Sequence, residues 1–305
     1  MLGNLLADVV AIADRQCSTV SLRQLTKVGL TDRHVRAWIR AERILQTRAR
    51  GVFRLPGAEM SWRQDLWIAV LAGPKGTVVS HASAAALRGL VHTPPEPHVT
   101  VPRGSSGRYG GALLHHATVL GADRCRFDGL PVTGVARTVV DCAGVFDQQA
   151  LDNLVDAALG RNLTSYRRIT AAWERAGRVR GGRLLDAAIS PFSGNVRLGS
   201  EKEALALRRF KEWGVPPPVC QYTIRDARGR FVGRIDFAWP QRQFGLEYLG
   251  DEPHAPRWWG HDEQRLRALE AAIGWRFELA DRFDMRPSAT RLRALLLEVL
   301  GEMAA

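Results

Sequence analysis

The chain has 305 residues, of which 46% are hydrophobic, and its formal net charge at pH 7 is +12. This length and composition favour two or three domains with packed cores and exclude a chain that is disordered throughout. The basic balance favours an anionic partner, with nucleic acid first and a membrane surface second.

The basic residues are most concentrated near the N-terminus. Only four of the 43 basic residues are lysines, a bias typical of GC-rich genomes, so the distribution of charge says more than its total. Residues 1–60 carry ten basic and five acidic side chains, a net charge of +5. Residues 191–305 carry 18 basic and 16 acidic side chains, a net charge of only +2. We therefore expect an anion-binding surface in the first 60 residues.

The pattern of cysteines and apolar segments argues against several other classes of protein. The four cysteines form no C-x-x-C pair, so we expect neither a zinc finger nor a disulfide framework. The N-terminal apolar run is interrupted by Asp8 and Asp14 and has no basic flank, so we expect no signal peptide. No segment approaches the roughly 18 apolar residues of a membrane span. We expect a cytoplasmic protein with reduced thiols and no membrane contact.

The N-terminal segment, residues 1–60, has the pattern of a helix-turn-helix. Leucine, valine and isoleucine side chains predict a first helix from Leu5 to about Arg15; they are Leu5, Leu6, Val9, Val10 and Ile12. The spacing of Ser21 and Gln24 predicts a capping box at the start of the second helix, which Gly29 ends. A third helix is predicted from its N-cap, Thr31, to about Glu42.

The third predicted helix has an apolar face and a basic face, about 130° apart at 100° per residue. The apolar face consists of Val35, Trp38 and Ile39, and the basic face consists of four arginines. A recognition helix in a major groove requires such a pair of faces, one packed on the protein and one turned to the DNA. Two short strands, 44–47 and 52–55, then flank a basic turn and predict a wing. The predicted DNA-binding residues are Arg33, His34, Arg36, Arg40, Arg43, Arg48 and Arg50. The alternative is a solvated basic helix in an arginine-rich chain.

This segment resembles a known family. The sequence CSTVSLRQLTKVGLTDRHVRAWIRAERILQTRARGVFRLPG is similar to the N-terminal domain of AbiEi-type antitoxins of type IV toxin–antitoxin systems. The resemblance implies a transcriptional regulator whose partner is double-stranded DNA, including the operon DNA of a nucleotidyltransferase-like toxin. The sequences VVSHASAAALRGL, PHVTVPRG and GLPVTGVARTVVDCA resemble the AbiEi segment that follows. They imply that residues 61–190 form an α/β scaffold or interaction domain.

Five histidines of the middle segment lie close in sequence: His81, His92, His98, His115 and His116. A metal site is one interpretation, but adjacent residues on a strand point to opposite faces and no H-E-x-x-H motif is present. We predict capping and surface histidines instead. Arg137, Thr138 and Asp141 are predicted to fix a helix start and a local ion pair, and we assign this segment no catalysis.

The third segment, residues 200–303, follows a linker at 190–200 and has the predicted order helix, three strands, helix, strand, helix. Alternation on its strands predicts two apolar faces, formed by Phe231, Ile235, Phe237 and Trp239 and by Phe244, Leu246 and Tyr248. Asp236 and Glu247 face the other way and meet on neighbouring strands, with Glu201 approaching from the helix. Such carboxylates can hold Mg²⁺, which can activate water against a phosphodiester.

The motifs RIDFAWP and GLEYLGDEPH resemble the PD-(D/E)XK nucleases, and more closely a bacterial family related to very-short-patch-repair endonucleases. The resemblance implies a restriction-endonuclease-like α/β domain, metal ligands Asp236 and Glu247, and catalytic residues Glu201, Asp236, Glu247 and His254. The sequence departs where Leu249 replaces the usual acid or lysine. We therefore predict a multidomain α+β protein with a degenerate nuclease-like domain, and the sequence indicates no certain cofactor. The alternative is an endonuclease with Mg²⁺, guided by the winged helix, in which Asp251 or His254 stands in for Leu249.

Overall fold

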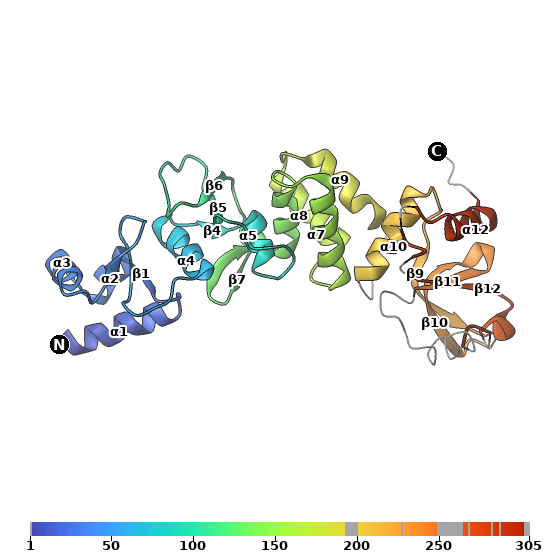
Figure 1. The fold of residues 1–305 in the computed structure, drawn as a ribbon, viewed down its shortest axis with the longest axis horizontal. Coiled ribbons are helices and arrows are strands. Elements are labelled where there is room, and N and C mark those ends of the chain that lie inside the picture. The colour runs from blue at the N-terminus through green and yellow to red at the C-terminus, as the bar shows by residue number, and fades with distance from the viewer. Residues whose placement is uncertain are drawn as a thin grey trace. The chain divides into compact units, whose positions relative to one another are not determined.

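The computed structural model describes residues 2–192, 201–226, 228–248, 265–267, 269–281, 283–286 and 288–301. They form a mixed α+β, multidomain fold with helices and three separate sheets (Figure 1). The chain divides into two units: the first is Met1–Asp147 with Ile169–Gly182, and the second is Gln148–Arg168 with Arg183–Ala305. Among the described residues, no helix is long and apolar enough to cross a membrane.

The first unit begins with three helices and a three-stranded antiparallel sheet of order β1-β3-β2. The elements are α1 (Leu2–Asp14), β1 (Thr19–Ser21), α2 (Leu22–Val28), α3 (Asp32–Arg40), β2 (Leu45–Gln46) and β3 (Val52–Arg54). The predicted capping box is confirmed, because the Ser21 side chain accepts from the backbone N–H of Gln24 while the Gln24 side chain accepts from that of Ser21. Gly29 ends α2 with a φ of 108°, and Thr31 caps α3, also as predicted. Strand β1 was not predicted from the sequence.

These elements enclose one apolar core. Val35 and Trp38 of α3 are buried in it, as predicted, and Ile39 packs against it half-buried. Val9 of α1 is fully buried, but Val10 is 36% exposed, so the apolar side chains whose spacing predicts this helix do not all face the core. The reason is the helical period, since position 10 lies about 100° around the helix from position 9.

A five-stranded sheet of order β6-β5-β4-β8-β7 forms the rest of the first unit. Its elements are α4 (Trp62–Ala72), β4 (Val78–Val79), α5 (His81–Ala86), β5 (His98–Val101), β6 (Leu113–His116), η1 (Gly121–Asp123), β7 (Arg124–Phe127), β8 (Leu130–Thr133) and α6 (Val135–Cys142). Because β4 and β8 run parallel, α5 and α6, which follow them, both begin at the carboxyl ends of these two strands. Helix α4 packs Leu66 and Trp67 against β4 and β8.

Residues 2–55 are joined to this sheet through α4. Arg23 donates hydrogen bonds to the carbonyls of Leu71 and Gly73, the latter at 2.8 Å. The Gln64 side chain donates to the carbonyl of Cys17 at 2.9 Å. These bonds explain why residues 2–55 and the five-stranded sheet belong to one unit. The predicted domain boundaries at 60 and 200 stay predictions.

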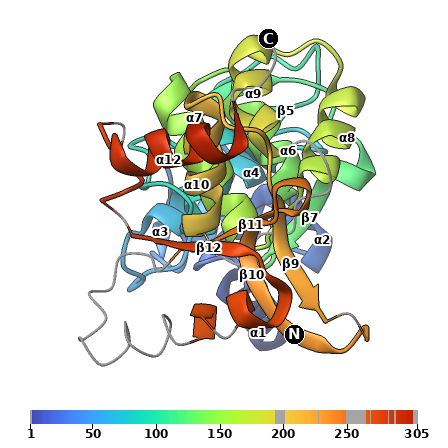
Figure 2. The ribbon, with the colours of Figure 1, turned by 90° about the vertical axis from the view of Figure 1, so that its right-hand side faces the viewer.

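The second unit combines helices with a sheet of order β12-β11-β10-β9, in which only β11 and β12 are parallel (Figure 2). Helices α8 (Tyr166–Ala176) and α9 (Gly182–Ile189) each have residues assigned to both units. The remaining elements are α7 (Gln148–Gly160), η2 (Ser190–Phe192), α10 (Glu201–Glu212), β9 (Val219–Arg225), β10 (Phe231–Trp239), η3 (Pro240–Arg242), β11 (Phe244–Tyr248), β12 (Arg276–Ala280) and α12 (Arg291–Leu300).

Helix α10 covers the sheet of the second unit, because Phe210 contacts the rings of Phe237 and Trp239 edge-on. The predicted inward face of β11 is confirmed, since Phe244 and Leu246 are fully buried and Tyr248 is 9% exposed. The prediction for Phe231 is wrong, because this side chain is 66% exposed. The register of β9 and β10 shifts between positions 231 and 233, and such a bulge reverses the alternation expected from one end of the strand to the other.

Candidate nucleic-acid interface

Helix α3 presents its arginines to solvent. Arg33, Arg36 and Arg40 are exposed on it, while Val35 and Trp38 hold the opposite face in the core. Within the described part of the chain, none of the three guanidinium groups has an ion-pair or hydrogen-bond partner. Their donors are therefore available to an anionic ligand.

The fourth arginine of the predicted stripe does not lie on the helix. Helix α3 ends at Arg40, Glu42 takes a φ of 52°, and the backbone N–H of Arg43 bonds to the carbonyl of Trp38 at 2.9 Å. This pattern is a Schellman ending, which turns the chain away from the helix axis. Arg43 is exposed just beyond that ending. The expectation that α3 runs to Glu42 is thus corrected.

His34 has a local structural contact. Its Nδ1 atom accepts a hydrogen bond from the backbone N–H of Thr31 at 3.3 Å, while the Thr31 hydroxyl accepts from the backbone N–H of His34 at 3.4 Å. This reciprocal pair is the capping box of α3. It orients the start of the helix, and a contact of His34 with DNA stays a prediction.

The β2–β3 hairpin places its two arginines differently. Arg48 forms an ion pair with Asp65 of α4 at 3.0 Å, so its guanidinium is tied to the neighbouring helix. Arg50 is exposed and, among the residues that the structure describes, has no ion-pair partner. The two predicted tip residues therefore differ in how free they are to bind an anion.

A groove of about 420 Å³ separates α3 from this hairpin. Arg36 and Asp32 lie on its helix side, and Arg50 lies on its hairpin side. Val35, Ile39, Val52 and Phe53 contribute to its lining. A groove with a cation on each side and an apolar floor suits a strand of phosphodiester backbone, whose charge two guanidinium groups can neutralise.

The second predicted site, the carboxylates of the C-terminal sheet, is also brought together. The pairing of Phe237 with Leu246 sets Asp236 beside Glu247 on the neighbouring strand. The backbone N–H of Asp236 donates to Glu247 Oε2 at 3.4 Å, and the backbone N–H of Tyr248 donates to Asp236 Oδ2 at 3.0 Å. Burial raises the pKa of both carboxyl groups, and the charge of Asp236 adds to the rise of the Glu247 pKa to about 7.

Two neighbours of this pair were missed by the sequence analysis. Arg265 forms an ion pair with Glu247, and the Gln221 side chain donates to Asp236 Oδ1 at 2.9 Å. Gln221 takes a φ of 52°, which is uncommon for a residue with a side chain. Arg265 lies 18 residues from Glu247, so no local pattern revealed this pair.

Helix α10 buries a different acid from the predicted one. Glu203 is only 5% exposed and lies on the helix face that also buries Ala206 and Phe210. Burial, with the charges of Glu203 and Asp236, raises the pKa of Cys220 to about 12, which places all three near one another. The seven-residue spacing from Phe210 could have indicated that position 203 is buried, but it does not reveal the nearby Cys220 and Asp236. The side chain of the predicted Glu201 lies outside the described residues.

The described residues contain no cluster of three histidine, cysteine, aspartate or glutamate side chains arranged to hold a metal ion. Asp236 and Glu247 supply two adjacent carboxylates, and the nearby Arg265 already neutralises one of them. Leu249, Asp251 and His254 lie outside the part of the chain that the structure describes, so their predicted roles stay predictions.

Three of the five middle-segment histidines pack together, which corrects their predicted surface placement. His81 is 8% exposed and its ring stacks on that of His115 with centroids 3.4 Å apart. His115 Nε2 lies 3.2 Å from His98 Nδ1. The strands β5 and β6 pair in parallel and bring His98 and His115 together across a sequence separation that no local signal spans. The predicted ion pair of Arg137 and Asp141 is confirmed at 2.7 Å.

Comparison with known proteins gives no functional name. No protein-family model matches the chain. The uncharacterized proteins MT2308 and Rv2248 from two strains of Mycobacterium tuberculosis are each 30% identical to it over 186 residues, which is 60% of this chain and 66% of each relative. The crystal structure of the RV2827C protein from Mycobacterium tuberculosis gives a TM-score of 0.40 at 19% identity and covers 67% of this chain and 80% of that one.

Proposed function

We propose that the protein is a DNA-binding transcriptional regulator and that residues 2–55 are its winged helix-turn-helix. The observation that carries the proposal is the set of exposed guanidinium groups on α3, Arg33, Arg36 and Arg40, which have no partner among the described residues. Leaving three adjacent cations unpaired costs a folded protein self-repulsion, which an anionic ligand removes. A helix of nine residues with this face fits the width of the major groove of DNA.

In the proposed complex, α3 lies in the major groove and the hairpin lies over the adjacent backbone. Arg36 and Arg40 are one turn apart and reach base edges, where a guanidinium binds guanine through two hydrogen bonds. Arg50 contacts phosphate across the groove that it shares with Arg36. The ion pair of Arg48 with Asp65 holds the hairpin against α4 and so fixes its angle to α3.

The proposed biological role follows from the resemblance to AbiEi-type antitoxins. We propose a cytoplasmic repressor that binds double-stranded DNA upstream of its own gene, in an operon with a nucleotidyltransferase-like toxin. The proposal is tested by titrating the full chain into a labelled duplex from that upstream region and into a shuffled duplex of equal length. Tighter binding to the upstream duplex is expected, and equal binding to both would leave only non-specific affinity.

For the C-terminal unit we propose a nuclease-like module that no longer cleaves DNA. Arg265 supports this, because a guanidinium on Glu247 competes with any metal ion for that carboxylate. The alternative is an endonuclease that uses Mg²⁺, which the side-by-side arrangement of Asp236 and Glu247 favours. A nicking assay on supercoiled plasmid separates the two.

A further inference from the structure

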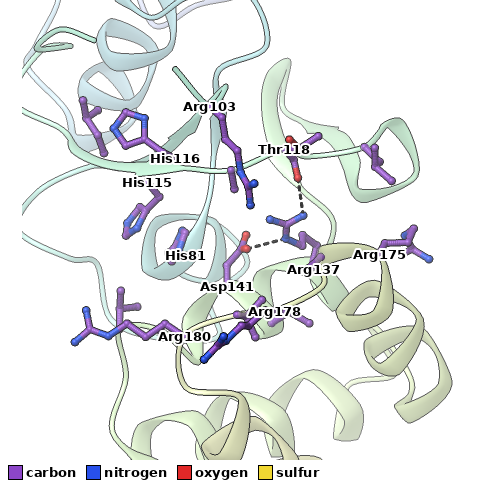
Figure 3. Close-up of a pocket in the computed structure, with 18 of the residues that line it drawn as sticks. His81, Arg103, His115, His116, Thr118, Arg137, Asp141, Arg175, Arg178 and Arg180 are labelled. Carbon is purple, nitrogen blue, oxygen red and sulfur yellow. Dashed lines mark hydrogen bonds and ion pairs between the residues drawn. The ribbon is translucent and has the colours of Figure 1, made fainter. Parts of the chain in front are cut away.

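A cavity of the first unit has no role in the proposed DNA contact. Its volume is about 710 Å³, within the range of small-molecule sites in proteins. Residues of β6, the segment after it, α6 and the segment after α8 line it (Figure 3). Its lining includes His81 of α5 and Arg137 of α6, the two helices that begin at the carboxyl ends of β4 and β8.

The lining is strongly basic. Five arginines border the cavity: Arg103, Arg137, Arg175, Arg178 and Arg180. Arg137 is buried and pairs with Asp141, while Arg175 pairs with the buried Asp123 at 2.5 Å. The other three are exposed and, in the part of the chain that the structure describes, have no acidic partner. Figure 3 shows Arg103 on one side of Arg137 and Asp141, with Arg178 and Arg180 on the other. An anion bound by Arg103, Arg178 or Arg180 therefore meets a guanidinium whose charge no described acid neutralises, while the one carboxylate between them, that of Asp141, is paired with Arg137.

The cavity wall includes the buried carboxylate of Asp141. It accepts from Arg137 through Oδ1, but among the residues that the structure describes its Oδ2 has no hydrogen-bond partner, and this oxygen is itself shielded from solvent although the side chain is 6% exposed. Buried polar atoms are nearly always satisfied, so this oxygen marks a place for a donor, which it reaches when the Asp141 side chain turns toward the cavity. Burial raises the pKa of Asp141 to about 6, which leaves it an ionised acceptor at neutral pH.

Large apolar side chains are exposed beside these charges. Leu113, Leu120 and Val145 line the cavity and are 43%, 45% and 39% exposed, respectively. Exposed apolar side chains are ordinary when scattered, but here three of them border one basic cavity. The ligand that fits is therefore anionic at one end, offers a hydrogen-bond donor, and has a flat or apolar part.

We propose that this cavity is a binding site for a nucleoside phosphate. The phosphates bind Arg103, Arg178 and Arg180, and the base covers Leu113, Leu120 and Val145. A ribose hydroxyl or base amino group donates to the Asp141 carboxylate, whose side chain turns toward the ligand. Guanidinium groups suit phosphate because they form paired, charge-assisted hydrogen bonds. The site does not depend on the proposed contact of α3 with DNA.

The test is calorimetric titration of the full chain with ATP, inorganic triphosphate and adenosine. ATP is expected to bind more tightly than either fragment, since it alone satisfies the arginines, Asp141 and the apolar side chains. The double variant Arg178→Ala/Arg180→Ala loses two charge-assisted contacts and is expected to weaken ATP binding by about tenfold or more. Arg108→Ala is the matched control, because Arg108 is exposed on the same loop as Arg103 but does not line the cavity.

Four results would overturn the proposal: no ATP binding at millimolar concentration, triphosphate binding as tightly as ATP, equal weakening in the Arg108→Ala control, or displacement of ATP by duplex DNA. The last would make the cavity part of a nucleic-acid surface. Asp141→Asn supplies a second test, with a reduced preference for ATP over triphosphate expected. The surface variants keep the proposal testable even if this buried substitution prevents folding.

Discussion

At the scale of single residues, burial decides the charge state of the histidine cluster. Burial lowers the pKa of His81, His98 and His115, that of His115 to about 4 from an ordinary 6.5, and the neighbouring imidazoles lower the His81 and His115 values further. Stacked rings 3.4 Å apart tolerate a neutral pair far better than two cations. The cluster is therefore neutral in the folded protein at physiological pH.

This predicts a loss of stability in acid. Between about pH 6.5 and pH 4 the unfolded chain binds protons that folded His115 does not, so the free energy of unfolding falls as the pH falls. His115→Gln removes that dependence, and the Tm loss from pH 7.5 to pH 5 should shrink by about 2–4 °C, roughly 1 kcal/mol after solvent screening. Thermal unfolding followed by circular dichroism checks this. The exposed His92→Gln is the control, and parallel curves for both variants would refute the prediction.

At the scale of elements, the features that depend on neighbouring residues in the sequence were predictable, and those that depend on tertiary contacts were not. The sequence was enough to assign helix caps to Ser21, Gly29 and Thr31, because a cap depends on residues within one turn. The three-residue β1 was missed because a strand that short has no periodicity. The exposure of Phe231 was mispredicted because a bulge depends on the partner strand. Arg43 was misplaced because a Schellman ending at Glu42 breaks the usual preference for glycine.

The hairpin arginines carry a prediction at this scale. Arg50→Ala should reduce the slope of log affinity against log salt by about one unit, because one phosphate contact is lost. Arg48→Ala should change the slope less, since its guanidinium already pairs with Asp65. Fluorescence anisotropy on one duplex over a range of salt concentrations measures both. Equal effects would mean that the ion pair opens on DNA, and an unaltered slope in Arg50→Ala would remove the hairpin from the interface.

At the scale of the whole molecule, the sequence could predict contacts between neighbouring strands but not groupings of residues that depend on the complete fold. The pairing of Asp236 with Glu247 follows from strand alternation, so it was predictable. The roles of Gln221, Arg265 and Glu203 require the folded sheet and helix together. The arginine-lined cavity joins residues from position 81 to position 180, and no spacing rule links them.

The nuclease-like module carries the prediction for the second unit. We expect no Mg²⁺-dependent nicking of supercoiled plasmid above background, because Arg265 competes for Glu247 and Leu249 supplies neither a metal ligand nor a cation for the transition state. Asp236→Ala should then leave DNA binding intact, as should Asp186→Ala, an exposed acid of the same unit. Robust nicking that Asp236→Ala abolishes and Asp186→Ala preserves would instead make the protein an endonuclease.

The central claim, DNA recognition by α3, is tested most directly by the ratio of affinities for the upstream duplex and the shuffled duplex. The full chain with Arg36→Ala/Arg40→Ala is compared with wild type and with Arg15→Ala, an exposed arginine beyond the end of α1. We predict that the double variant loses about 1–3 kcal/mol of preference per arginine, while the control keeps the wild-type ratio. An unchanged ratio and unchanged affinity in a folded double variant would contradict the claim.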